Sequence, residues 1–251
     1  MKRFRIGVWS VLVVIALVAC KFVIATLGFE ILSLNTLIGS AIGGATFIVG
    51  FLLSGLIADY KEAERIPGEF RATLENILEE VRLFAQAHPT FDESSARERI
   101  LRVVTSFFTG VHVQSAHDLT PCLVAIDALS EIFTQMEQGG MPPNFLVRLK
   151  TEQGIARRIV LRVSHIQRTQ FIPSAHILAL SLIALVIALL LLVKTEGSPE
   201  SVVVFAFLSY LFVYVGRLIS VIEQPFQEGA ESMDDVSLFL LHELEEKMKV
   251  R

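Results

Sequence analysis

Four long apolar runs limit what this 251-residue chain can fold into. Residues 7–28, 36–58, 173–193 and 202–222 are each 21 to 23 residues long, and the second run carries no charge. A helix of that length crosses the ~30 Å of hydrocarbon in a bilayer at ~1.5 Å per residue. The mean hydropathy of the whole chain, +0.58, is high because of these runs. The sequence therefore predicts an integral membrane protein with four spans.

Lysine and arginine in the connecting segments predict how the spans are oriented. Three basic residues precede the first run, whereas the short loops 29–35 and 195–200 contain none. The long segment 59–172 carries thirteen lysines and arginines, and the tail 223–251 adds more. Basic segments stay on the cytoplasmic side of a membrane. We therefore expect both termini, the long segment and the tail to be cytoplasmic.

The beginning of the chain permits a second interpretation. A basic start and an apolar stretch lead to Leu17-Val18-Ala19-Cys20, which resembles a lipoprotein cleavage box. Apolar residues continue past Cys20 to Leu27, so an uncleaved first span is the preferred prediction. Cys20 lies in a membrane run and Cys122 in the polar segment, so we expect neither a disulfide nor a cysteine-based metal site.

The segment 59–172 has the apolar periodicity of helices and no alternating strand pattern. Apolar residues from Phe70 to Phe84 recur every three or four positions, so each helix needs a partner to cover its apolar face. The predicted helices are one that Pro67 opens and His88-Pro89 ends, one capped by Ser94 or Ser95, one over 122–138 that stops at Gly139-Gly140, and one after Pro142-Pro143. We predict an all-α fold with four transmembrane helices continuous with a cytoplasmic helical bundle, as a single domain over 1–251.

Several functional classes find no support in the sequence. No nucleophile elbow, P-loop, zinc-protease or dinucleotide-binding pattern occurs, so we predict neither an enzyme nor a cofactor. The net charge of −4 comes without a basic face, which excludes nucleic acid as a partner.

The second apolar run contains two phenylalanines on one helical face. Phe47 and Phe51 are four residues apart, so on a helix they are about 6 Å apart along the axis. Small residues that allow close helix approach surround them: Gly39, Ser40, Gly43, Gly44, Gly50, Ser54 and Gly55. One interpretation is a tightly packed bundle helix in which the phenylalanines fill a gap. The other is a helix around an oligomer axis, where stacked aromatic rings make a hydrophobic constriction that gates by dewetting.

These residues carry a resemblance to a known family. Thr46-Phe47-Ile48-Val49-Gly50-Phe51 resembles S-F-V-L-G-F, the pore signature in the second helix of the bestrophin family. The stretch from Asp59-Tyr60 to Ile66-Pro67 resembles the polar extension that ends in Leu-Pro in that family. After the fourth run, LISVIEQPFQEGAESMDDVSLFL resembles LINPFGEDDDDFE. The order of spans, two before and two after a long helical segment, is also similar.

The resemblance implies an ion channel of a bacterial inner membrane. It implies a ring-shaped homo-oligomer, a pentamer, whose second transmembrane helices line an axial pore with Phe47 and Phe51 at its neck. Gly43 replaces a further apolar neck residue of the family, which makes that ring wide or absent. Ser40, Gly50 and Ser54 would line the pore or pack between helices. Passive conduction of chloride-type anions is the default, although the family also contains cation-conducting bacterial members.

Acidic residues could modify this function at two places. Asp59 and Glu62 would place negative charge at the inner mouth of the pore and favour cations. Four residues correspond to the acidic stretch that helps to hold calcium in animal members: Glu228, Glu231, Asp234 and Asp235. Four other residues dilute that stretch, so the alternative is that Asp234 and Asp235 cap the terminal helix.

Charged residues within the spans have two interpretations each. Lys21 would reach the outer interface along its aliphatic stem, or contribute to an outer vestibule. Arg217 would reach the inner headgroups, or contact Glu223 or Asp59. His176 is expected at the membrane interface.

Two functional hypotheses follow from the sequence. The first is a homo-oligomeric ion channel, whose partners are the lipid bilayer, further copies of the chain and permeating inorganic ions. The second is a non-conducting membrane scaffold or sensor whose cytoplasmic helical bundle binds a partner. In that case the phenylalanines only pack, and the glycines only promote helix association.

Overall fold

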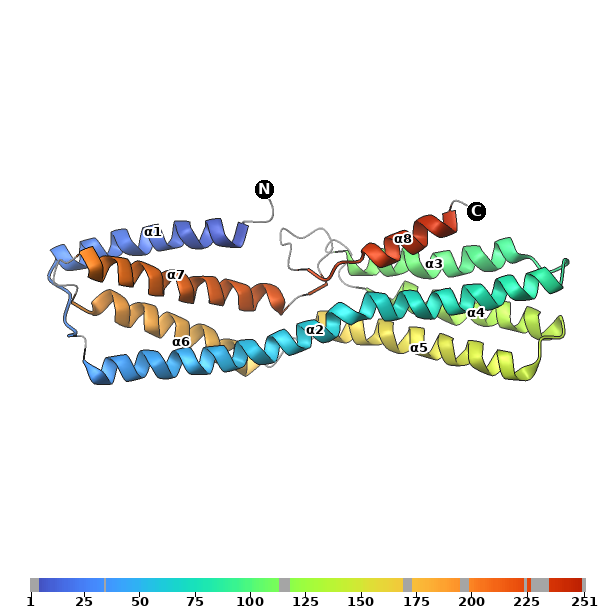
Figure 1. Ribbon diagram of the computed structural model, residues 1–251, viewed down its shortest axis with the longest axis horizontal. Coiled ribbons are helices and arrows are strands. Elements are labelled where there is room, and N and C mark those ends of the chain that lie inside the picture. The colour runs from blue at the N-terminus through green and yellow to red at the C-terminus, as the bar shows by residue number, and fades with distance from the viewer. Residues whose placement is uncertain are drawn as a thin grey trace. The chain divides into compact units, whose positions relative to one another are not determined.

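The computed structural model describes residues 5–33, 35–112, 118–168, 173–194, 199–223, 225–226 and 235–249. Within these ranges the chain is all-α, as the sequence predicts, with one isolated parallel bridge between Leu32 and Val193. The eight helices are α1 (Arg5–Thr26), α2 (Thr36–Ala87), α3 (Glu93–Val111), α4 (Thr120–Gln138), α5 (Pro143–Arg168), α6 (Pro173–Leu192), α7 (Pro199–Ile222) and α8 (Phe239–Lys249) (Figure 1).

The helices pack into two compact units. The membrane unit contains α1, α2 as far as Tyr60, α6 and α7, and the polar unit contains α2 from Lys61 onward, α3, α4, α5 and α8. The single domain expected from the sequence stays a prediction.

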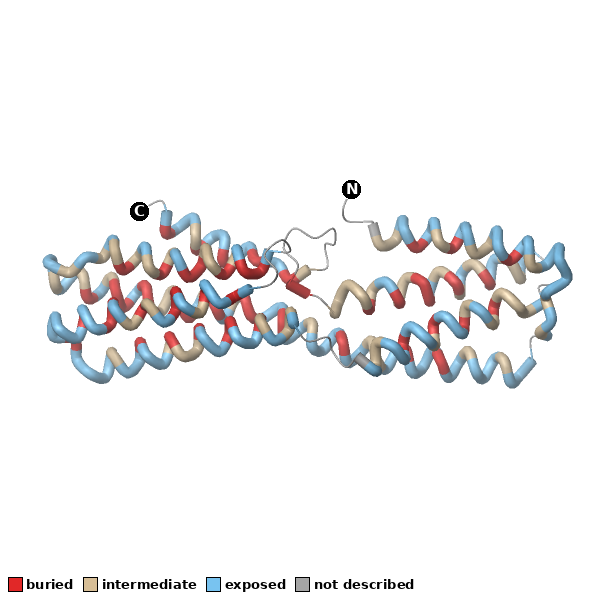
Figure 2. The backbone as a smooth tube through the Cα atoms, turned by 180° about the vertical axis from the view of Figure 1, so that it is seen from behind, coloured by how far each residue is buried: buried red, intermediate tan, exposed pale blue. Residues whose placement is uncertain are grey.

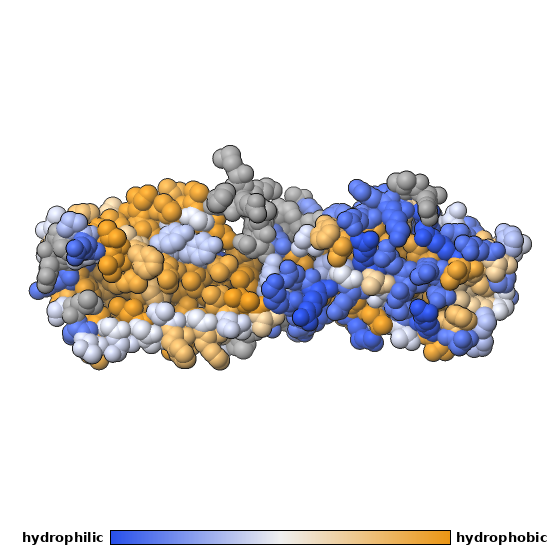
Figure 3. All heavy atoms as spheres, viewed as in Figure 1, coloured by the Kyte–Doolittle hydropathy of each residue, from blue (hydrophilic) through white to orange (hydrophobic). Residues whose placement is uncertain are grey.

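The four helices of the membrane unit are long and apolar enough to span a bilayer. The candidate spans are Ile6–Thr26, the apolar part of Thr36–Ala87, Ser174–Leu192 and Pro199–Ile222. They coincide with the four apolar runs of the sequence to within a few residues. The face of this unit that Figure 3 shows is largely apolar, which is the kind of surface that a multi-pass membrane protein presents to lipid.

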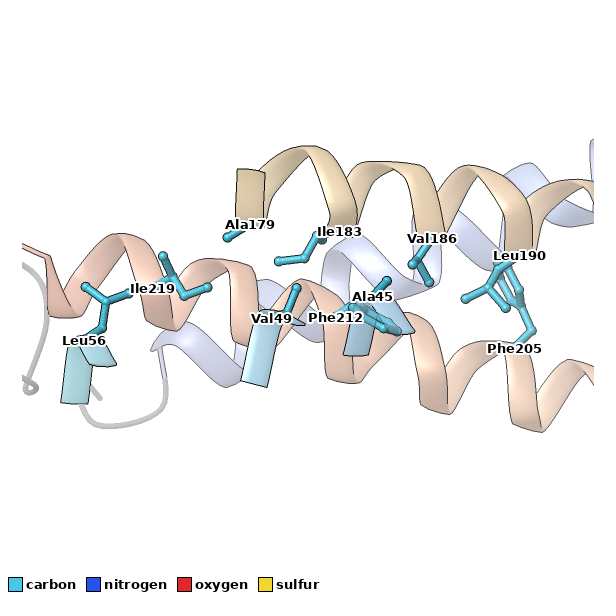
Figure 4. Packing of buried hydrophobic residues seen from close by; sticks show 10 residues of the cluster. All are labelled: Ala45, Val49, Leu56, Ala179, Ile183, Val186, Leu190, Phe205, Phe212 and Ile219. Atoms are coloured by element: carbon cyan, nitrogen blue, oxygen red, sulfur yellow. The ribbon is translucent and has the colours of Figure 1, made fainter. Parts of the chain in front are cut away.

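The core of the membrane unit lies where α2, α6 and α7 meet (Figure 4). It consists of ten buried residues: Ala45, Val49 and Leu56 of α2, Ala179, Ile183, Val186 and Leu190 of α6, and Phe205, Phe212 and Ile219 of α7. Gly216 of α7 permits this close packing, because a Cβ atom there would lie 3.3 Å from Ile183 Cδ1. α1 packs mainly against α7.

The polar unit is a helical bundle built on the stripe that the sequence shows after Pro67. Phe70 and Phe107 meet at a ring-centroid distance of 5.0 Å, and both are fully buried. Each buried side chain of this kind contributes roughly 1.5–3 kcal/mol to folding. The remaining predicted residues of the stripe are buried as well: Leu74, Ile77, Leu78, Val81 and Phe84. Figure 2 shows buried positions along the helices of each unit.

Two predicted helix boundaries are wrong. The second apolar run and the helix after Pro67 form one continuous helix of 52 residues, with Pro67 inside it. Proline in a helix interior costs about 3 kcal/mol, but the buried Ala63, Ile66 and Phe70 around Pro67 provide packing that offsets this cost. The cap of α3 is Asp92, whose carboxylate accepts from the Ser95 backbone N–H, so neither Ser94 nor Ser95 is the capping residue.

The other predicted ends are confirmed. α2 ends at Ala87, directly before His88-Pro89, and α4 ends at Gln138 with Gly139 as its C-cap. A Cβ atom on Gly139 would lie 2.7 Å from the Phe84 ring, so the close approach of α2 requires glycine there. α5 begins at Pro143, as the proline pair predicts.

α8 is held on the bundle by an apolar face and by two charged residues on one side of it. Leu241, Leu244 and Met248 are buried. Arg71 of α2 contacts Glu243 at 2.6 Å, and Lys247 contacts Glu75 at 3.0 Å. Burial alone would raise the pKa of Glu75, but Lys247 and Arg71 outweigh it and hold that pKa below its ordinary value. Ionised Glu75 therefore stabilises the docked α8.

The stability of the polar unit should depend on pH through Glu75. The pKa of Glu75 is lower in the folded protein than in the unfolded chain. Its contribution to the free energy of unfolding is therefore complete above the unfolded pKa of ~4.3, and it is lost as pH falls through the folded pKa. We expect Glu75→Gln to lower the free energy of unfolding by about 0.5–1 kcal/mol at neutral pH, and this difference from wild type to shrink at acidic pH. Thermal unfolding followed by circular dichroism across this pH range measures the difference. Glu98→Gln, whose side chain is 71% exposed beside Arg102, is the control and should change little at either pH; equal effects of both variants would contradict the prediction.

Candidate functional site

The apolar part of α2 has one face that belongs to the protomer core and one that does not. Ala45, Val49 and Leu56 point into the cluster with α6 and α7 (Figure 4). Phe47 and Phe51 lie on the opposite side and are 76% and 73% exposed. The two rings therefore do not fill a gap within their own protomer. The candidate site is this exposed face of α2, which we call the phenylalanine face: Ser40, Gly43, Gly44, Phe47, Gly50, Phe51 and Ser54.

The glycines of this face have no packing role inside the protomer. A Cβ atom built on Gly43, Gly44 or Gly50 would meet no described atom within 4 Å, in contrast to Gly216 of α7. A glycine inside a helix costs about 0.5–1 kcal/mol relative to alanine. The protomer gains nothing in return for this cost. Close approach by another copy of the chain, or an open path beside the helix, would account for these residues.

The outward faces of the other spans have a different composition. α1 exposes large apolar side chains, and so do α6 and α7: Val8, Val11, Leu12 and Ile15, then Ile177 and Leu185, then Val203, Val204 and Phe207. Side chains of this kind suit contact with acyl chains. On the phenylalanine face the only large side chains are the two aromatic rings. This face is thus the part of the membrane unit least like a lipid-facing surface.

Asp59 and Glu62, the acidic residues expected at the inner mouth, have different surroundings. Asp59 is exposed near the end of the apolar part of α2. Glu62 accepts a hydrogen bond from Arg162 of α5 at 2.9 Å, and Glu64 contacts Lys61 at 2.7 Å. The positive partners offset part of the negative charge that the sequence suggests there.

Lys21 is buried near the ends of α1 and α6, and its predicted role, reaching the outer interface or contributing to an outer vestibule, stays a prediction. Its side chain is 4% exposed, and its ammonium group contacts Glu30 at 2.8 Å. The same group donates to the carbonyl oxygens of Leu190 at 3.3 Å, Leu191 at 2.9 Å and Val193, at the C-terminal end of α6. These carbonyls have no intrahelical donor, so a buried cation is well placed to satisfy them. The sequence feature that could have indicated a buried Lys21 is Glu30 in the following loop, because Glu30 provides the opposite charge.

Arg217 and His176 also have partners that the sequence did not indicate. The Arg217 guanidinium lies over the Trp9 ring, 5.7 Å from its centroid, rather than against Glu223 or Asp59. Glu223 instead contacts His176 Nδ1 at 2.6 Å, which joins the beginning of α6 to the end of α7. The Glu223 side chain is buried, and the pair lies at the same end of the membrane unit as Trp9 and Arg217.

Comparisons with known proteins bear on this arrangement. No protein-family profile matches the sequence, and no curated protein matches it. Crystal structures of three variants of a bacterial bestrophin homologue from Klebsiella pneumoniae do match. The first has a TM-score of 0.79 at 12% identity, covering 97% of this chain and 97% of that chain. The second has a TM-score of 0.73 at 15% identity, covering 98% of this chain and 97% of that chain. The third has a TM-score of 0.76 at 14% identity, covering 98% of this chain and 96% of that chain.

The chain has the fold of bacterial bestrophin homologues. At this level of identity the likeness concerns the fold alone, and it extends over nearly the whole chain. It confirms the resemblance drawn from Thr46–Phe51 and from the order of spans. Because the likeness extends over nearly the whole chain, it includes the long α2. The sequence did not predict that α2 continues through Pro67.

The calcium site considered from the sequence stays a prediction. Glu228, Glu231 and Asp234 lie outside the described residues. Asp235 is described, but α8 begins only at Phe239, so Asp235 is not its N-terminal cap. Within the described ranges, no group of three histidine, cysteine or acidic residues is arranged to hold a metal ion.

Both cysteines are free thiols. Cys122 is buried in the polar unit, and burial raises the pKa of its thiol to about 12. The thiol therefore stays protonated and unreactive at neutral pH. Cys20 is exposed on α1, in the membrane unit.

Proposed function

We propose that this protein is an ion channel whose pore is lined by the phenylalanine faces of several copies arranged around an axis. The observation that carries the proposal is the exposure of Phe47 and Phe51 on a face whose glycines serve no packing within the protomer. Assembly of several copies around an axis would account for both the exposed phenylalanines and the glycines. The glycines allow close approach of neighbouring α2 helices, and the rings narrow the central path.

The neck of this pore is formed by two aromatic rings from each copy. Phe47 and Phe51 lie about 6 Å apart along α2, so each contributes one ring of side chains. Gly43, one turn earlier, adds no side chain, so the path widens there. Ser40, Gly50 and Ser54 provide hydroxyl groups or space between these levels. A hydrophobic neck of this kind excludes water when narrow and conducts when it widens.

The proposed permeant ion is an anion of the chloride type, and the proposed assembly is a pentamer in a bacterial inner membrane. The likeness to bestrophin homologues and the motif at Thr46–Phe51 support both assignments. The edges of aromatic rings are electropositive, which suits a passing anion. At the end of the path near Asp59, the pairing of Glu62 with Arg162 reduces the charge that would favour cations. We place both termini and the polar unit on the cytoplasmic side.

Recording from purified protein in planar bilayers under a potassium chloride gradient tests the proposal. We expect single-channel steps and a reversal potential displaced towards the chloride equilibrium potential. Displacement towards the potassium potential would retain the channel and overturn anion selectivity. The mass of the detergent-solubilised particle is measured in parallel. A monomer or dimer without current cannot form the ring and would favour a membrane scaffold or sensor instead.

A further inference from the structure

One exposed surface of the membrane unit combines a tryptophan with an arginine. Trp9 of α1 is 48% exposed, and the exposed Arg217 of α7 stacks over its ring at 5.7 Å. One turn earlier on α7, Tyr214 packs against Tyr210 with a ring-centroid distance of 5.8 Å. The pair lies where α1 packs against α7, and the proposed pore does not involve it, because the phenylalanine face belongs to α2.

The pair lies near the ends of two candidate spans, on the side of the membrane unit where α1 begins and α7 ends. Trp9 lies four residues after the beginning of α1, or about 6 Å along the helix. Arg217 lies five residues before the end of α7, or about 8 Å. From this depth the long arginine side chain can reach the headgroup layer, which lies outside the hydrocarbon. Tryptophan and tyrosine favour this depth, where one part of the ring is apolar and the other meets water.

Around the pair, the surface suits the two parts of a phospholipid. Val8 and Leu12 flank Trp9 on α1 and are 56% and 60% exposed, which offers an apolar surface to an acyl chain. A guanidinium stacked on an aromatic ring keeps the N–H groups at its edge free to donate, and these match phosphate oxygens in geometry. The stacking also fixes the guanidinium, so less side-chain freedom is lost on binding.

We propose that Trp9 and Arg217 form a binding site for the phosphate headgroup of an anionic phospholipid, in the leaflet where α1 begins and α7 ends. The depth of the pair and the adjacent apolar side chains favour a lipid over a free phosphate ion, since only a lipid uses both. The proposal concerns the outer surface of the membrane unit. It holds whether or not the phenylalanine face conducts ions.

Trp9 is the only tryptophan of the chain, so its fluorescence reports on this site directly. We would reconstitute the full-length protein in phosphatidylcholine vesicles that contain a fixed minor fraction of brominated phosphatidylglycerol or of brominated phosphatidylcholine. Bromine quenches tryptophan at short range. We expect stronger quenching by the brominated phosphatidylglycerol. Arg217→Gln should reduce this preference about fivefold, the factor that corresponds to the ~1 kcal/mol which one arginine gains near an anionic surface.

Matched variants and a competing ion make the test decisive. Arg217→Lys keeps the positive charge but loses the planar group over Trp9, so it should keep only part of the preference. Arg102→Gln removes an arginine from the polar unit, where its side chain is 66% exposed, and should change nothing. Equal quenching by the two brominated lipids in the wild-type protein would overturn the proposal, and so would an unchanged preference in Arg217→Gln. Loss of the preference on adding inorganic phosphate would assign the site to a free anion and would likewise overturn it.

Discussion

Replacing Phe47 and Phe51 together by alanine should raise the single-channel conductance several-fold in planar bilayers. Each substitution removes a benzyl group from the proposed neck, and five copies of the chain would remove ten. A hydrophobic constriction controls conduction through its width and its ability to exclude water, so its removal leaves a wider and wetter path. The voltage and gradient for the comparison are those used for the wild-type protein.

The double variant should also fold and assemble normally, which makes the result interpretable. Replacing a phenylalanine that is buried in a core by alanine lowers the free energy of unfolding by about 3–5 kcal/mol. Both rings are more than seven-tenths exposed in the protomer, so their removal leaves no cavity there. Phe207→Ala is the matched control. Phe207 is also a phenylalanine and is 63% exposed, but it lies on α7, outside the phenylalanine face.

Two outcomes would contradict the role given to the rings. A conductance equal to that of the wild type, with the same particle mass, would place Phe47 and Phe51 outside the conduction path. Dissociation of the oligomer in the double variant, with Phe207→Ala intact, would show that the rings pack between subunits. An equal rise in conductance in Phe207→Ala would indicate general loosening of the membrane unit rather than a wider neck.

The helices and the spans could be predicted from the sequence because they follow from local rules. An uncharged run of about 20 residues must form a helix in lipid, since no water is present to satisfy its backbone. The stripe from Phe70 to Phe84 has helical spacing, and every member is buried in the polar unit. The end of α4 at Gly139 follows from the same kind of local signal.

The errors in the prediction of the fold arise where packing overrides a local signal. Pro67 is a helix breaker by propensity, yet α2 continues through it because its neighbours Ala63 and Ile66 are buried. Ser94 and Ser95 are both suitable caps, but Asp92 lies at the position from which its carboxylate reaches the Ser95 N–H. A choice among adjacent capping residues depends on where the chain enters the helix, and that is not a local property.

For the candidate site, the sequence indicated the residues but not their surroundings. The spacing of Phe47 and Phe51 places them on one face of a helix, but it does not say whether that face meets α6, lipid or another copy. Only the burial of Ala45 and Val49 on the other side identifies the phenylalanine face as the exposed one. The partners of Lys21 were not predicted for a related reason. The depth of Lys21 in the span can be predicted from the sequence, whereas its contact with α6 joins residues about 170 positions apart.

Replacing Lys21 by methionine should destabilise the membrane unit by about 3–5 kcal/mol, the cost of removing one partner of a buried ion pair. The substitution keeps the volume of the side chain but leaves Glu30 without its cation. It also removes the donor to the last carbonyls of α6. For a chain of this length, such a loss lowers the unfolding midpoint by roughly 10 °C. The temperature at which half of the detergent-solubilised protein loses its monodisperse elution measures it.

A second substitution separates the ion pair from the helix end. Glu30→Gln in the Lys21→Met background removes the carboxylate that has lost its lysine and should recover part of the lost stability, because the carbonyls of Leu191 and Val193 still lack their donor. Lys61→Met is the control for loss of a lysine. Its side chain is 62% exposed beside Glu64, so its midpoint should stay within about 2 °C of wild type. If Lys21→Met were as stable as this control, Lys21 would not be the buried link between α1, the loop at Glu30 and the end of α6.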